Sequence, residues 1–169
     1  MRRVMRNHVV GKNSLQYLYQ TVSPVKVIRN YLIITLGRIC PSLRLKNFLY
    51  RFFLKMQIGQ DVSLGLHMMP DVFFPEKISI GENTIIGYNT VILTHEYLLN
   101  EWRVGRVEIG KNVLIGANST ILPGISVGDN AVVSAASLVN KDVPAGAFVG
   151  GVPARPIPRK ISQKIPERV

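Results

Sequence analysis

The sequence predicts a mainly β protein: a parallel β-helix of triangular coils, preceded by a helical segment and followed by a short C-terminal tail. Three observations carry this prediction. Aliphatic residues recur every six positions in the second half of the chain. Glycine and asparagine follow many of them at fixed offsets. The whole net positive charge lies in the first third, before the repeats become regular.

The six-residue period is most regular between residues 109 and 140. Its aliphatic positions are Ile109, Ile115, Ile121, Val127, Val133 and Val139, and the same register appears earlier at Ile80, Ile86 and Ile92. An α-helix would need apolar residues about 3.6 positions apart. Strands of about five residues instead direct each aliphatic residue, and a small or β-branched residue four positions later, into one interior. Each Gly-x-Asn step then turns a corner, because both residue types tolerate positive φ.

Three such sides return the chain to its starting line about 4.8 Å higher, which is one strand spacing. We therefore expect Ile109, Ile115 and Ile121 to begin the three sides of one coil. The valines that follow at the same spacing begin the sides of the next coil. The two coils share one aliphatic core.

The net charge of +11 divides the chain. Residues 1–56 contain eleven basic residues and no acidic one, whereas residues 57–169 contain ten of each. We therefore expect a basic N-terminal segment at 1–56, a β-helix domain at 57–156 and a tail at 157–169. The single cysteine, Cys40, excludes an intrachain disulfide and suits a reducing compartment.

In the N-terminal segment we expect a basic, weakly ordered arm or short helix at 1–21, followed by helices at 25–38 and 42–55. Pro24 suits the start of the first helix and Pro41 separates the two. The second helix has an apolar stripe, and its opposite side is polar. The stripe is Leu45, Phe48, Leu49 and Phe52, and the polar side is Arg44, Asn47, Arg51 and Lys55.

Two interpretations of this stripe stay open, and they are compatible. It packs on the end of the β-helix and covers the open strand edge, or the basic amphipathic surface rests on anionic lipid. The apolar run at residues 31–36 is far shorter than the roughly 20 residues of a membrane span. No secretory signal pattern is present. We expect a cytoplasmic protein, with the inner face of the membrane as its site of peripheral contact.

The β-helix domain has two interruptions. Ile58 and Leu64 predict an imperfect first coil, after which residues 66–77 break the phase. Ile92 and Ile109 are 17 residues apart, and the segment between them contains Trp102, which no coil interior can hold. We therefore expect residues 95–106 to leave the coils as a loop, where functional residues are common.

With these features in place, the chain resembles the hexapeptide-repeat acyltransferases. Within them it is most similar to the maltose, galactoside and nodulation-factor O-acetyltransferases and to bacterial glycan acetyltransferases. The resemblance rests on Thr94-His95, Ile115-Gly116-Ala117-Asn118, Ile121-Leu122-Pro123-Gly124, Asn140-Lys141-Asp142-Val143-Pro144 and Gly151-Val152-Pro153-Ala154-Arg155. It implies a left-handed coil and a homotrimer. It also implies acetyl-CoA as acyl donor, bound between neighbouring subunits.

The resemblance also implies roles for individual residues. His95 matches the family's catalytic histidine. The positions that match cofactor-binding residues are Ala117, Ala135, Asn140, Lys141 and Arg155. Asn140 stands where the family usually has threonine, and the family's substrate-side asparagine has no clear counterpart. Met68 and Met69 lie in that region, so a simple maltose or galactoside acceptor is not supported.

Acetyl transfer to an alcohol needs a base, and histidine, with an ordinary pKa near 6.5, suits that task. Glu96 is the candidate that orients His95, the alternative being a solvated carboxylate. Candidate acceptor-site residues are His67, Met69, Tyr97 and Trp102. His67 could instead be a packing residue, and the two aromatic residues could instead anchor the loop. Ser119 and Ser137 are expected to fill the core.

The predicted function is acetyl-CoA-dependent O-acetylation of a sugar or glycan precursor, with His95 as general base. A xenobiotic (antibiotic) acetyltransferase is the alternative within the same class. A metal protein similar to the γ-class carbonic anhydrases would need three converging histidines. The chain has only His8, His67 and His95, and His8 lies in the basic arm, so no metal is expected. A basic nucleic-acid-binding module is the third alternative, but no known motif supports it.

Overall fold

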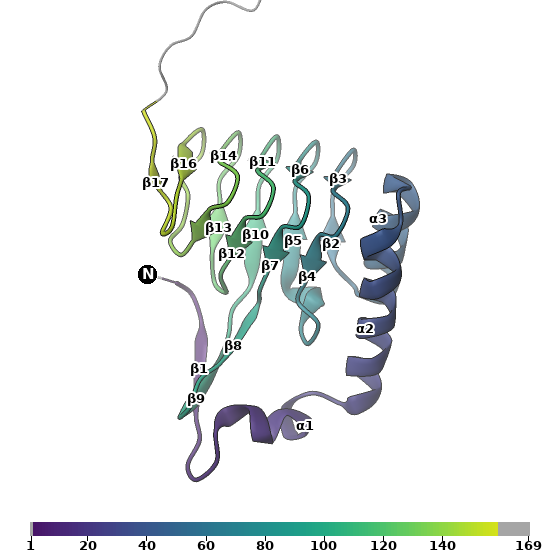
Figure 1. The fold of residues 1–169 in the computed structure, drawn as a ribbon, viewed down its shortest axis with the longest axis vertical. Helices are drawn as coiled ribbons and strands as arrows, with labels where there is room; N and C mark the ends of the chain where they lie inside the picture. Colours follow the sequence, from purple (N-terminus) through teal and green to yellow (C-terminus); the bar gives the residue numbers. More distant parts are fainter. Residues whose placement is uncertain (1, 159–169) are drawn as a thin grey trace, which may run out of the picture.

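The computed structural model describes residues 2–158. A stack of coils forms the body of the molecule, two helices cover one end of the stack, and the chain leaves at the other end (Figure 1). Of the predicted tail, 157–169, only residues 157 and 158 lie within the described part.

Three parallel sheets form the sides of the coils. The first contains β2 (Gln57–Ile58), β5 (Ile78–Ile80), β10 (Val107–Ile109) and β13 (Ser126–Val127). The second contains β3 (Ser63–Leu64), β6 (Ile85–Ile86), β11 (Leu114–Ile115), β14 (Val132–Val133) and β16 (Phe148–Gly150), with β17 (Arg155–Pro156) antiparallel at its edge. The third contains β4 (Met69–Pro70), β7 (Val91–Ile92), β12 (Thr120–Ile121) and β15 (Leu138–Val139). The chain visits the three sheets in turn, which makes a parallel β-helix.

The predicted register is confirmed. Ile109 lies between Ile80 and Val127 in the first sheet, and the aliphatic positions of the other two sheets stack in the same way. These residues are buried in one core. The residues four positions later are buried with them: Val113, Ser119, Ile125, Ala131 and Ser137. Ser119 and Ser137 are thus core residues, as expected.

At the corners, asparagine and glycine have different tasks. Asn83, Asn89 and Asn118 take positive φ of 52–57°, as predicted. The preceding corner glycine, Gly116, does not have positive φ; it is needed for space. A Cβ there would lie 2.3 Å from the backbone nitrogen of Ala135 in the next coil. The expectation that both residue types supply positive φ is therefore wrong for this glycine.

The first coil is more complete than predicted. Pro70 pairs with Ile92 in the third sheet, so the six-residue phase continues from Ile58 through Leu64 to Pro70. The break begins only at Asp71, where a short insertion with a 3-10 turn, η2 (Pro75–Lys77), leads to β5. A proline in an inward position hides the third side of this coil in the sequence.

The segment at 95–106 leaves the coils as predicted. It forms an antiparallel hairpin of β8 (His95–Tyr97) and β9 (Glu101–Val104). The N-terminal arm is not weakly ordered: β1 (Met5–His8) pairs antiparallel with β9 and makes a third strand. It continues into η1 (Ser14–Tyr17) and α1 (Leu18–Thr21).

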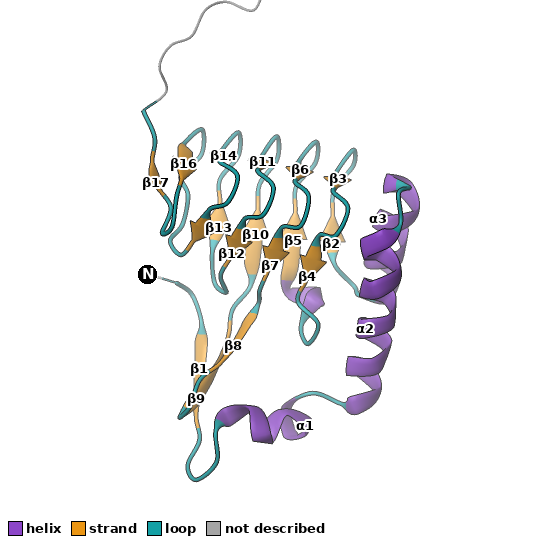
Figure 2. Ribbon diagram, in the orientation of Figure 1, coloured by secondary structure: helices purple, strands orange, loops and turns teal. Residues whose placement is uncertain are grey.

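Two helices, α2 (Pro24–Ile39) and α3 (Leu43–Phe53), cover the first coil (Figure 2). Pro24 occupies the first turn of α2, as predicted. The predicted packing of the α3 stripe is wrong for three of its four residues, because Leu45, Phe48 and Phe52 face outward and are about half exposed. Only Leu49 packs against the core, as predicted.

Instead, Lys46, Asn47 and Arg51 bond to the coil, whereas Arg44 is exposed, so only part of the predicted polar side faces the coil. Lys46 donates to the carbonyls of Leu64 and Gly65 at 3.1 and 3.0 Å. Asn47 donates to that of Val62 at 2.7 Å, and Arg51 donates to two further carbonyls of the coil. The physical reason is that the free edge of the first coil presents unpaired carbonyls, which need donors rather than apolar cover. Within residues 2–158, no helix is both long and apolar enough to cross a membrane.

Candidate active site

A buried carboxylate holds the predicted catalytic histidine. His95 opens β8, where the hairpin leaves the second coil, and its side chain is 16% exposed. Its Nδ1 lies 2.6 Å from Oδ2 of Asp71, a fully buried carboxylate. Asp71 follows β4 directly, so the ends of two neighbouring coils bring the pair together.

Asp71 also fixes the backbone on both sides of the site. Its Oδ1 accepts from the N–H groups of Phe73 and Phe74 at 2.8 and 2.9 Å. Its Oδ2 accepts from the N–H groups of Thr94 and His95 at 2.7 and 3.1 Å. Burial alone would raise the pKa of Asp71. The hydrogen bond and charge of His95, together with backbone donors, outweigh burial and lower that pKa below its usual value.

An ionised carboxylate can only accept hydrogen bonds. The Nδ1 of His95 therefore carries a proton, which leaves Nε2 as the nitrogen that can accept one. This pairing gives the histidine a fixed tautomer and ring orientation, as a general base requires.

Aromatic side chains surround the imidazole. The ring centroids of Phe73 and Tyr97 lie 4.6 and 5.4 Å from that of His95. Trp102 stacks on Tyr97 with centroids 6.2 Å apart. The structure thus brings the predicted Tyr97 next to the predicted base, and Trp102 next to Tyr97. The Tyr97 hydroxyl also lies 2.9 Å from Oγ1 of Thr21, and burial raises its pKa.

Glu96 does not contact His95. Its carboxylate accepts from Arg2 at 2.8 Å and lies 3.9 Å from Arg103. The predicted orienting role is therefore corrected: Asp71 takes it, and Glu96 ties the N-terminal arm to the hairpin. The physical reason is strand alternation, because neighbouring side chains on β8 point to opposite faces. Sequence reasoning missed Asp71 and Phe73; the only signal was the position of Asp71 at the first break in the repeat.

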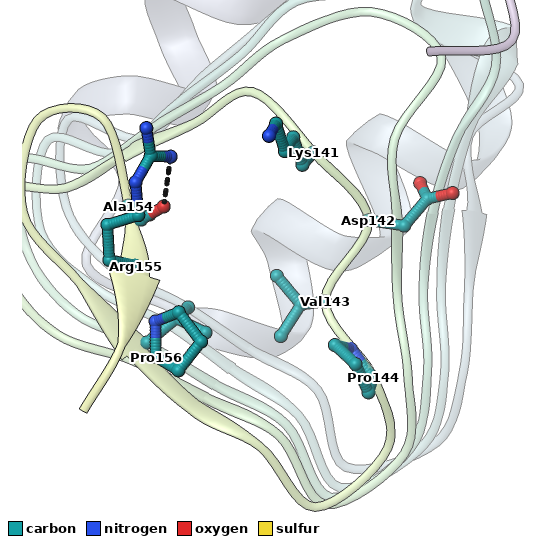
Figure 3. Close-up of a pocket in the computed structure, with 8 residues that line it drawn as sticks. Lys141, Asp142, Val143, Pro144, Ala154, Arg155 and Pro156 are labelled. Carbon is teal, nitrogen blue, oxygen red and sulfur yellow. Dashed lines mark hydrogen bonds between the residues drawn. The ribbon is translucent and has the colours of Figure 1, made fainter. Parts of the chain in front are cut away.

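Two predicted phosphate-binding residues share a pocket at the C-terminal end of the stack. This pocket has a volume of about 340 Å³ and is lined by Lys141, Asp142, Val143, Pro144, Val149, Ala154, Arg155 and Pro156. Lys141 and Arg155 stand on different sides of it (Figure 3). The arrangement places two exposed cations around a mainly apolar hollow, which suits an anionic ligand with an apolar part.

Ala117 and Ala135 lie at another corner of the prism. They stack in successive coils between the second and third sheets, and the N–H of Ala136 donates to the carbonyl of Ala117 at 2.8 Å. His95 and Lys141 instead follow strands of the third sheet. Near Lys141, the buried Oδ1 of Asn140 has no hydrogen-bond partner within residues 2–158. One chain therefore does not bring the alanines and His95 to the same corner.

The remaining candidates lie outside the aromatic cluster. His67 is at a corner of the first coil with φ of 59°, and its ring packs edge-on against Tyr88. Met69 pairs with Val91 in the third sheet and is partly buried against the core. Across residues 2–158, no group of three His, Cys, Asp or Glu side chains is arranged to hold a metal ion.

Comparison with known proteins agrees with this geometry. Residues 106–141 match the family model for the hexapeptide repeat of succinyl-transferase. The chain is 56% identical over 155 residues to the Bacillus subtilis protein named "Putative acetyltransferase YvoF", covering 92% of this chain and 90% of that protein. It is 37% identical over 94 residues to the galactoside O-acetyltransferase of Escherichia coli, covering 52% of this chain and 46% of that protein. A hexapeptide-repeat acetyltransferase of Vibrio cholerae, solved in complex with acetyl coenzyme A, has a TM-score of 0.62 at 22% identity, covering 85% of this chain and 96% of that one.

Coils of six-residue period, with a histidine held by a carboxylate beside an extruded hairpin, define the class as a β-helical transferase. The chain belongs to the hexapeptide-repeat acetyltransferase family.

Proposed function

We propose that this protein is an acetyl-CoA-dependent O-acetyltransferase that acts on a hydroxyl of a sugar or glycan precursor, with His95 as general base. The observation that carries the proposal is the 2.6 Å contact between His95 Nδ1 and the buried carboxylate of Asp71. With Nδ1 engaged, Nε2 of His95 is the nitrogen that can take the acceptor's proton, and the rings of Phe73 and Tyr97 lie beside the same imidazole.

The proposed reaction is a direct transfer. Nε2 of His95 accepts the hydroxyl proton as the acceptor oxygen attacks the thioester carbonyl carbon. The carbon–sulfur bond breaks when the tetrahedral intermediate collapses, and the thiolate takes the proton from the imidazolium. A backbone N–H at a coil corner stabilises the oxyanion. The products are an acetyl ester and the free thiol of CoA, and no acyl-enzyme forms.

The donor assignment draws support from the relatives and from charge. Acetyl coenzyme A occupies the related Vibrio cholerae protein, and coenzyme A occupies a galactoside acetyltransferase of similar fold. In this chain, Lys141 and Arg155 would meet the phosphates, with Asn140 beside them. Ala117 and Ala135, at their own corner, would meet the part nearer the thioester.

A homotrimer completes the proposal, together with the left-handed coil that the family resemblance implies. His95 and Ala117 lie at different corners of one chain. A neighbouring subunit that offers its alanine corner to the His95 corner would assemble one site at each of three interfaces.

The acceptor assignment rests on the stacked Tyr97 and Trp102. Trp102 stacks on Tyr97 with centroids 6.2 Å apart, and Tyr97 packs on His95 at 5.4 Å, so aromatic rings adjoin the proposed base. Aromatic side chains suit the apolar face of a sugar ring, while the sugar hydroxyls face His95.

The test is CoA thiol release from acetyl-CoA across a panel of sugars, glycan precursors and a hydroxylated antibiotic. His95→Ala should lower turnover by about 10²–10⁴-fold, the usual contribution of a general base. Its assembly mass and its binding of CoA should stay at wild-type levels. Near-normal turnover of this variant would show that His95 is not the base.

A further inference from the structure

The outward side of the helical hairpin is an unusual surface for a protein in water. Six large apolar side chains lie on it, here called the apolar helical face: Val25, Ile28, Leu32 and Leu36 of α2, with Phe48 and Phe52 of α3. Each is at least 54% exposed. They recur at helical spacing on both helices, so each helix shows a continuous stripe.

This face points away from the coils because each helix packs on them through its opposite side, which includes several polar or small residues. On α2 these are Asn30 and Gly37, where a Cβ at Gly37 would clash with Tyr50 of α3. On α3 they are Lys46 and Asn47, which satisfy the carbonyls of the first coil. An exposed apolar layer of this extent marks a docking surface rather than scattered surface residues.

We propose that the apolar helical face docks onto an anionic lipid bilayer. The surrounding charge favours this occupant, because residues 1–56 contain eleven basic residues and no acidic one. Arg29 and Arg44 are exposed on the same two helices, and Nζ of Lys55 lies 5.1 Å from the ring centroid of Phe52. Apolar side chains with exposed cations on the same helices fit an interface of acyl chains and anionic headgroups.

A second copy of the chain fits this face less well. Apposed copies would bring two segments together that carry only positive charge, with no carboxylate in either segment to pair with them. Neither helix can cross a bilayer, so α2 and α3 would lie flat on it. In a cytoplasmic protein this would be the inner face of the membrane.

Docking would place the candidate active site close to the lipid surface. Asn30, on the inward side of α2, donates to the carbonyl of Val72 at 2.8 Å, and Val72 is the residue after Asp71. Thr21 of α1 meets Tyr97. The two helices α2 and α3 would therefore lie between the bilayer and the loops that hold His95. Docking itself does not depend on the proposed reaction.

The experiment is co-sedimentation of the full chain with vesicles of phosphatidylcholine, with and without about 30% phosphatidylglycerol. Leu36→Glu and Phe48→Glu each place a carboxylate in the face. Val10→Glu is the matched control, because it makes the same charge change in the same segment at a residue 92% exposed in the loop after β1. Leu36→Gln repeats the test without a charge change, should Leu36→Glu fail to fold.

We expect wild type to pellet with the anionic vesicles and hardly with the neutral ones. The two face variants should bind about tenfold more weakly, and Val10→Glu less than about twofold. Equal losses in Val10→Glu and the face variants would overturn the proposal, since net charge alone would then explain binding. So would equal binding to both vesicle types. A lower assembly mass of Leu36→Glu without lipid would show that a second copy covers the face instead.

Discussion

Asp71 joins two loops and one imidazole through a single carboxylate. Its side chain is fully buried and accepts four backbone hydrogen bonds as well as the contact from Nδ1 of His95. The residue therefore serves stability and function together, since Oδ2 orients His95 while Oδ1 of the same carboxylate holds the backbone at the first break in the repeat.

The free energy of unfolding should depend on pH in a way that reflects the lowered pKa of Asp71. A carboxyl whose pKa is lower when folded stabilises the fold above its unfolded pKa, near 3.9, and loses this contribution as pH falls through the folded pKa. Asp71→Asn should therefore lower the free energy of unfolding by about 3 kcal/mol at pH 7. The difference from wild type should persist to about pH 5 and shrink below about pH 4.

Urea unfolding of both proteins between pH 3 and 7 measures this difference. Asp61→Asn is the control, because Asp61 is exposed and Asn tolerates its positive φ of 53°. A difference for Asp71→Asn that does not change with pH would mean that its charge is not what stabilises the fold.

At the scale of the element, each corner of the β-helix is limited by the coil above it. Gly116 lies directly against the backbone of Ala135, whereas Gly146, in the last coil, has open space and a φ of +69°. The two glycines therefore hold their positions for different reasons, one for space and the other for backbone conformation.

Alanine substitution should separate these reasons. Gly116→Ala puts a Cβ against backbone that cannot move without shifting a coil, and should cost about 3 kcal/mol or more. Gly146→Ala should cost only the conformational penalty of about 1–2 kcal/mol. In thermal unfolding, Gly116→Ala should melt several degrees below Gly146→Ala. Equal midpoints would mean that the coils can separate at this corner.

At the scale of the whole molecule, one chain holds the parts of the proposed site at separate corners. His95 follows the third sheet, and Ala117 lies between the second and third. A site that needs both must be shared between subunits, so catalysis and assembly would be inseparable.

Mixed assemblies test this sharing. His95→Ala and Ala117→Trp should each be inactive alone, the first without the base and the second with the donor path blocked. Co-expressed with different tags and purified through both, trimers that contain both variants should recover about one site in three. Activity no higher than that of the two parents would place the whole site within one chain.

The sequence by itself determined the repeat. Six-residue spacing fixes which side chains enter the core, and it predicted the pairing of Ile109 with Val127 and the exit of a loop from the coils at His95. These features depend on local alternation and on turn residues, which the sequence displays directly. The family resemblance added the catalytic role proposed for His95 and the cofactor-binding role proposed for Lys141 and Arg155.

Only the tertiary structure decided the partner of His95, the third strand of the hairpin and the orientation of α3. Asp71 and His95 are 24 residues apart and meet because neighbouring coils end at the same corner. β1 joins β9 across almost a hundred residues. Most of the α3 stripe faces outward because the unpaired carbonyls of the first coil need donors, and hydrogen bonding at a free strand edge outweighs apolar cover. The unpaired carbonyls exist only after the coil has formed its free edge, so the residue pattern of the helix alone could not predict which side of α3 faces the coil.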